Sequence, residues 1–207
     1  MDTAELPLVG GHPALDLVNT VERGHGERRD QLADPPALLG WALRAGLVDG
    51  GEARAVAAGW ERDPAAAEAA LAAARAVREA LHLALLAAIG VERPDPGPLE
   101  RLRERWVAAL GRARLAPDPD RTSAARLVVG TEPATLIADR AAVGAVELLR
   151  GADLARLRRC PPEAGGCGWV FLDRSRNGSR RWCRMADCGT TVKARRLTER
   201  RRAARAG

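Results

Sequence analysis

The four cysteines of the chain are the residues whose type and spacing could do chemistry. Cys160 and Cys167 form one pair, Cys183 and Cys188 form a second, and fifteen residues separate the two pairs. Thiolates bind Zn²⁺ well, and four of them complete a tetrahedral shell at about 2.3 Å from the ion. The sequence therefore predicts one zinc site with four cysteine ligands. Because four thiolates leave no coordination position open, we expect the zinc to be structural and not catalytic.

Two disulfides are the main alternative to a metal site. Disulfides require an oxidising compartment, and the acidic N-terminus, Met1 to Glu5, lacks the basic region of a signal peptide. The longest apolar run, Leu83 to Val91, is far shorter than the ~20 residues of a membrane span. We therefore expect a cytoplasmic protein with no membrane partner, in which the thiols bind metal.

The residues around the cysteines predict a small β-hairpin followed by a helix. Val170 to Leu172 is a short apolar strand, Asn177-Gly178 is a favoured hairpin turn, and residues 179–182 are expected to return as the second strand. A helix-compatible run follows the second cysteine pair. This order is that of a treble-clef-like zinc finger. The aromatic residues expected to form its small core are Trp169, Phe171 and Trp182.

Positive charge is concentrated at the same end of the chain. The whole sequence has a net charge of +6, but the residues from Arg156 onward carry +11 and the rest carry −5. A basic end on an acidic body is typical of a polyanion-binding protein, although a merely solvated tail is an alternative. DNA is the expected partner, and RNA stays open because an arginine-rich helix suits either nucleic acid. The predicted contact residues are Arg174, Arg176, Arg180, Arg181, Lys193, Arg195, Arg196 and Arg200.

The finger resembles the CGNR type of zinc finger. The resemblance rests on residues 167–177, 181–189 and Lys193, and residues 10–20 resemble the opening of the ABATE domain that precedes this finger in its family. Proteins of that family are regarded as stress-induced bacterial transcription regulators. The resemblance implies a DNA-binding regulator whose N-terminal domain senses a small-molecule effector or forms a homodimer. The chain departs from the family pattern at Thr190-Thr191, where Asn and Arg are usual, and in the wide spacing of its first cysteine pair.

Three polar residues near the N-terminus are candidates for a ligand pocket. His12, Asp16 and Asn19 follow a Gly-Gly turn and alternate with apolar residues. They could line a small-molecule site of a carrier or an enzyme. Polar residues beside turns more often cap the backbone, and we favour that interpretation. The chain also lacks a phosphate-binding glycine loop, Gly-x-Ser-x-Gly and His-Glu-x-x-His, so we expect no enzymatic activity.

The periodicity of residues 64–89 predicts the central helix of the N-terminal part. The run from Pro64 to Ile89 is apolar apart from one stripe, and a helix that is apolar around most of its girth is usually covered on most sides. We expect the polar stripe to face solvent and His82 to be a surface residue. The stripe consists of Glu68, Arg75, Arg78, Glu79 and His82.

The remaining pattern predicts an α+β protein in two parts. Asp34-Pro35 and Asp63-Pro64 are helix starts, with Asp as N-cap and Pro in the first turn. The other elements expected are helices at about 52–61, 99–110 and 131–151, and a hairpin of 114–116 with 127–129. We predict a mostly helical ABATE-like domain with this small β element at 1–152, and the zinc finger at 153–207.

Overall fold

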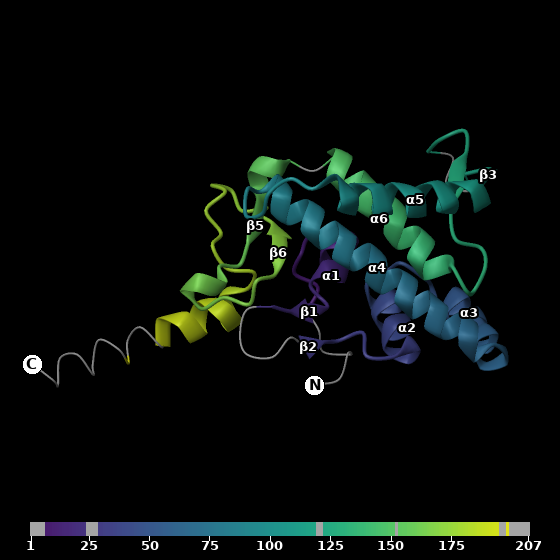
Figure 1. The fold of residues 1–207 in the computed structure, drawn as a ribbon, viewed down its shortest axis with the longest axis horizontal. Helices are drawn as coiled ribbons and strands as arrows, with labels where there is room; N and C mark the ends of the chain where they lie inside the picture. Colours follow the sequence, from purple (N-terminus) through teal and green to yellow (C-terminus); the bar gives the residue numbers. More distant parts are fainter. Residues whose placement is uncertain (1–6, 24–28, 119–121, 152, 195–197, 199–207) are drawn as a thin grey trace, which may run out of the picture.

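The computed structural model describes residues 7–23, 29–118, 122–151, 153–194 and 198. Figure 1 shows α4 (Pro64–Ala88) running through the middle of the molecule, with α3 (Gly50–Arg62) at one end and the cysteine-rich region at the other. The fold is a mostly helical N-terminal region with small hairpins, followed by a four-cysteine region with short strands and a helix. The predicted fold class is therefore confirmed.

Aspartates begin the first long helices, because their carboxylates accept hydrogen bonds from backbone amides that have no partner within the helix. Asp34 caps α2 (Pro35–Arg44) through the amide of Ala37 at 2.8 Å, and Asp63 caps α4 through the amide of Ala66 at 3.0 Å. Both predicted starts are confirmed. Helix α5 (Pro96–Arg112) begins earlier than expected, inside a proline-containing run, because Asp95 caps it through the amide of Gly97.

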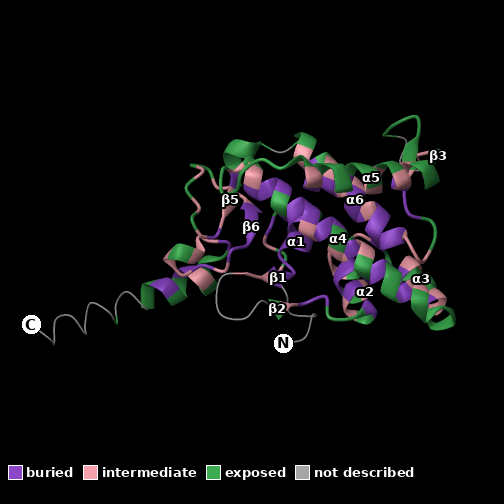
Figure 2. Ribbon diagram, viewed as in Figure 1, coloured by how far each residue is buried: buried purple, intermediate pink, exposed green. Residues whose placement is uncertain are grey.

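Helix α4 is the centre of the core. It packs against α1 (Pro13–Val18), α2, α3, α5 and α6 (Leu136–Gly151), and α5 and α6 also pack on each other. Figure 2 shows the buried residues concentrated along these contacts. The prediction of a central helix is confirmed.

The prediction that the polar stripe of α4 faces solvent is wrong for Arg78 and His82. The exposed fraction is 1% for Arg78 and 7% for His82, while Ala69, Ala72 and Ala76 on another face are exposed. Arg78 can be buried because the short hairpin of β1 (Val21–Glu22) and β2 (Arg29–Asp30) supplies it with a carboxylate.

Two further hairpins complete the fold. Strands β3 (Arg114–Ala116) and β4 (Arg126–Val128) are antiparallel, as predicted. In the cysteine-rich region, β6 (Val170–Leu172) pairs with β5 (Leu157–Arg159), which precedes Cys160. No helix among the described residues is long and apolar enough to cross a membrane.

The predicted return strand at residues 179–182 is wrong. The Asn177-Gly178 turn exists, but β6 pairs with β5, which precedes it in the chain. The segment after β6 is therefore ordered by other contacts. The buried carboxylate of Asp173 provides it, because it accepts hydrogen bonds from the amides of Ser175 at 2.9 Å and Arg180 at 2.8 Å.

Candidate metal centre and nucleic-acid interface

The four cysteine sulfurs converge on one point. All four Sγ atoms lie within 4.8 Å of one another, and the chain positions them in two ways. Cys160 and Cys167 lie in the connection between β5 and β6, where the amide of Cys160 donates to the carbonyl of Trp169 at 2.8 Å. Cys183 precedes the short π-helix η4 (Met185–Gly189), which carries Cys188, and helical backbone continues through residues 190–194.

The loop between the first two cysteines closes tightly on the sulfur of Cys160. A Cβ atom on Gly166 would lie 2.6 Å from that sulfur and 2.8 Å from the carbonyl oxygen of Pro161. The longer spacing of this pair is accommodated by the short helix η3 (Pro162–Ala164) and by Gly165, whose φ is +94°. Beneath the sulfurs, Phe171 is fully buried and Trp169 nearly so, with Trp182 packed beside them. The predicted aromatic core of the finger is confirmed.

The distances between sulfurs fit a metal centre and not disulfides. Cys167 and Cys183 have their Sγ atoms 3.3 Å apart, and those of Cys183 and Cys188 are 3.7 Å apart. A disulfide requires about 2.0 Å, whereas tetrahedral Zn–S bonds of about 2.3 Å place sulfurs about 3.8 Å apart. All four cysteines are free. The cluster is that of a four-cysteine zinc finger with one structural zinc ion, as predicted.

The four thiols of the cluster shift one another's pKa. Hydrogen bonds from Cys167, Cys183 and Cys188 lower the pKa of the Cys160 thiol, and the hydrogen bond with Cys160 raises the pKa of Cys167. A divalent ion binds the thiolate form of cysteine, so its binding displaces thiol protons.

Comparison with family models assigns both parts of the chain. Residues 11–152 match the ABATE model, described as "Putative stress-induced transcription regulator", and residues 156–201 match the CGNR zinc finger. The chain belongs to the ABATE family and carries the CGNR zinc finger at its C-terminal end. A comparison with functionally curated proteins gave no match.

The basic residues predicted to bind nucleic acid fall into different environments. Arg176, Arg181 and Lys193 are exposed. Arg174 is also exposed, but its guanidinium donates to the carbonyl of Gly11 at 2.6 Å. The other predicted positions in the C-terminal run, Arg195, Arg196 and Arg200, lie outside the described residues.

Arg180 is engaged within the finger itself. Its guanidinium donates to the carbonyls of Trp182 and Cys183, and its Cζ atom lies 4.3 Å from the centre of the Phe171 ring. The side chain thus covers the small core and bridges to the second cysteine pair. Arg181 makes a longer contact of this kind, 5.3 Å from the Trp182 ring, and stays open to solvent.

His12, Asp16 and Asn19 all use their polar groups on the backbone. His12 caps α1 through the amide of Ala14 at 3.1 Å, and Asp16 accepts from the amide of Gly10 at 2.8 Å. Burial raises the pKa of Asp16, and backbone hydrogen bonds oppose that shift. Asn19 bonds to Val170 in the finger. The interpretation of these three residues as a ligand pocket stays a prediction.

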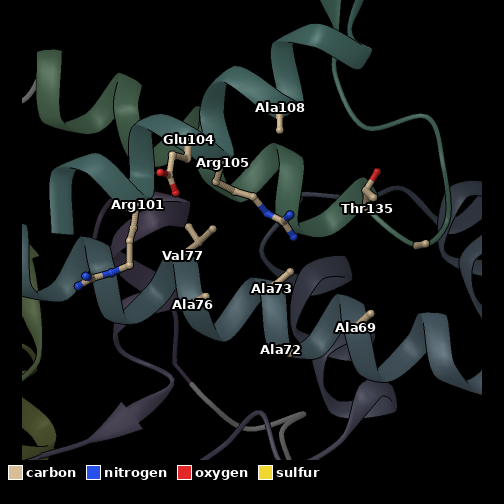
Figure 3. Close-up of a pocket in the computed structure, with 11 residues that line it drawn as sticks. Ala69, Ala72, Ala73, Ala76, Val77, Arg101, Glu104, Arg105, Ala108 and Thr135 are labelled. Carbon is tan, nitrogen blue, oxygen red and sulfur yellow. The ribbon is translucent and has the colours of Figure 1, made fainter. Parts of the chain in front are cut away.

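A groove elsewhere on the helical domain offers space that the sequence did not indicate. It has a volume of about 710 Å³ and lies between α4 and α5, with Ala69, Ala72, Ala73 and Ala76 along its floor (Figure 3). Arg105 extends over these alanines in the close-up. The groove exists because the alanine face of α4 is turned outward, and the sequence pattern could not show that orientation.

Proposed function

We propose that the protein is a transcription regulator that binds DNA through its CGNR finger. The convergence of four sulfurs in a region with exposed basic side chains carries this proposal. Zinc stabilises a finger that has little core of its own, and the ordered finger presents Arg176, Arg181 and Lys193 toward solvent. Phosphate contacts of this kind supply affinity without choosing a sequence.

The test is a titration of the zinc-loaded protein with duplex DNA at several salt concentrations. Each phosphate contact adds about 0.9 to the slope of log K against log salt. A double variant, Arg176→Ala with Lys193→Ala, should therefore lower the slope by about 2. Arg62→Ala is the matched control, because Arg62 is exposed at the end of α3, far from the finger (Figure 1). Equal slopes for the double variant and the wild type would contradict the assignment of these residues.

RNA is the alternative partner, and the same titration separates it from DNA. Structured RNA added as a competitor should displace the protein less well than duplex DNA of equal length. Preferential binding to the RNA would replace the regulator by an RNA-binding zinc protein. The small-molecule effector, the homodimer, the domain boundary at 152 and the absence of enzymatic activity stay predictions.

A further inference from the structure

Asn19 connects the two family domains through a pair of buried hydrogen bonds. Its side-chain oxygen accepts from the amide of Val170 at 2.9 Å, and its side-chain nitrogen donates to the carbonyl of Val170 at 2.8 Å. Asn19 is 1% exposed and lies 151 residues away from its partner in the chain. Both polar groups of the side chain are thus used on one residue of β6.

Residues 10–23, here called the docking segment, also contact the finger at several positions from Cys167 to Leu172. Leu172 donates its amide to the carbonyl of Gly10 at 2.9 Å, and the indole of Trp169 donates to the carbonyl of Val21 at 3.2 Å. At the far end, the amide of Arg23 donates to the carbonyl of Cys167 at 3.3 Å. The docking segment therefore reaches a cysteine of the metal cluster itself.

Ion pairs and hydrogen bonds of partly buried charged side chains fix the other side of the docking segment to α4. The guanidinium of Arg23 donates to Glu79 of α4 at 3.1 and 3.2 Å and to the carbonyl of Val18 at 2.9 Å. Arg78 donates two hydrogen bonds of 2.7 Å to Asp30 and one of 3.1 Å to Thr20. Arg78 and Glu79 of the polar stripe thus face the docking segment.

Apolar contacts also join the finger to the helical domain. Leu157 of β5 and Val170 of β6 are buried in the core of the helical domain, together with Leu15 and Leu81. One face of the finger hairpin is therefore part of that core, while Cys160, Trp169, Phe171 and Cys183 form the small core of the finger.

We infer that Asn19, Arg23 and Arg78 of the ABATE domain are positioning residues of the zinc site. They hold the Cys167 end of the loop that joins Cys160 to Cys167. Zinc affinity therefore depends on the docking segment, and the order of the docking segment depends on zinc. Partners of this kind around a metal centre typically change metal affinity by 10–100-fold. Linkage requires the effect to be reciprocal.

Competition for zinc with a chromogenic chelator, measured on the full chain, tests whether zinc affinity depends on the docking segment. Asn19→Ala leaves the buried amide and carbonyl of Val170 without this partner, and zinc affinity should fall about tenfold or more. Asn177→Ala is the matched control, because Asn177 is an exposed asparagine in the same finger, and its zinc affinity should equal that of the wild type. A folded Asn19→Ala protein with unchanged zinc affinity would overturn the inference.

Hydrogen exchange on the wild type tests whether the order of the docking segment depends on zinc. It needs no substitution, so it tests the inference even if Asn19→Ala does not fold. Removing zinc should speed exchange at residues 10–23 and leave α2 and α3 as they were. Unchanged exchange at residues 10–23 would overturn the inference. Neither measurement involves nucleic acid, so the result is independent of whether the proposed DNA binding holds.

Discussion

At the scale of single residues, Gly166 lies in the loop between Cys160 and Cys167 at a place with no room for a side chain. A Cβ atom there would lie 2.6 Å from the Cys160 sulfur and would also clash with backbone atoms of Pro161. Gly166→Ala must therefore displace a cysteine of the cluster. We expect the variant to release zinc to a chelator faster than the wild type does.

Gly111→Ala is the control for that substitution. Gly111 lies in α5, no neighbouring atom lies within 4 Å of the place that a Cβ atom would take, and alanine is favoured over glycine in a helix by up to about 1 kcal/mol. Zinc release from Gly111→Ala should match the wild type. Equal zinc release from all three proteins would show that the close approach at Gly166 has no effect on the metal site.

Asp30 makes the stability of the helical domain depend on pH. Burial alone would raise the pKa of Asp30, but the hydrogen bonds and charge of Arg78, the amide of Leu32 and the charge of Arg75 together outweigh burial and lower it. A carboxyl whose pKa is lower in the folded state contributes its full stability above the ordinary value of about 3.9, and that contribution is lost as the pH falls below this value. Asp30→Asn should cost about 2 kcal/mol at neutral pH, because the buried Arg78 guanidinium loses its charged hydrogen bonds to Asp30 and keeps Glu79, at 3.1 Å, as its remaining counter-charge.

The measurement is urea unfolding of the wild type and Asp30→Asn at pH 7 and pH 3. The difference in unfolding free energy between the two proteins should be largest at pH 7 and smaller at pH 3. Glu68→Gln on the exposed side of α4 serves as a control that should match the wild type at both values. A difference for Asp30→Asn that does not change with pH would contradict the role of its charge.

At the scale of elements, the start of α3 joins a helix cap to a contact between helices. Asp49 accepts from the amides of Gly51 and Glu52, and the Glu52 carboxylate accepts from the amide of Asp49 and pairs with Arg140 of α6 at 2.5 Å. Asp49→Ala should lower the free energy of unfolding by about 1 kcal/mol, because the first amides of α3 lose their acceptor. Asp49→Asn should keep most of the stability, since asparagine caps equally well. Equal losses in the two variants, measured by urea unfolding, would rule out capping as the cause.

Local signals predicted most of the elements correctly. Asp followed by Pro marked the starts of α2 and α4, because capping involves only neighbouring residues. Periodicity correctly places the polar residues of α4 on one face of the helix. It does not say whether that face meets solvent or a buried partner. The partner, Asp30, comes from a hairpin 48 residues earlier in the chain. The strand expected after the Asn-Gly turn failed for a related reason, because β6 already pairs with β5.

At the scale of the whole molecule, the four cysteines could be predicted as a site because a metal ion restricts both the type and the spacing of its ligands. The contacts between the finger and the helical domain could not be predicted. Asn19 and Val170 are far apart in sequence, and an asparagine after a short helix has many possible partners. The polar residues around Asn19 stand beside a turn in the sequence, a pattern that indicates a ligand pocket or helix caps and not a contact with the finger.

The proposed function requires the zinc-bound finger to present basic side chains to DNA. The most direct measurement is duplex DNA binding against salt concentration, for protein of measured zinc content and for the same protein after zinc is removed. We predict one zinc ion per chain, a linear fall of log K with log salt for the zinc-loaded protein, and much weaker binding without zinc. A protein that holds its full zinc and shows no salt-dependent binding to DNA would contradict the account.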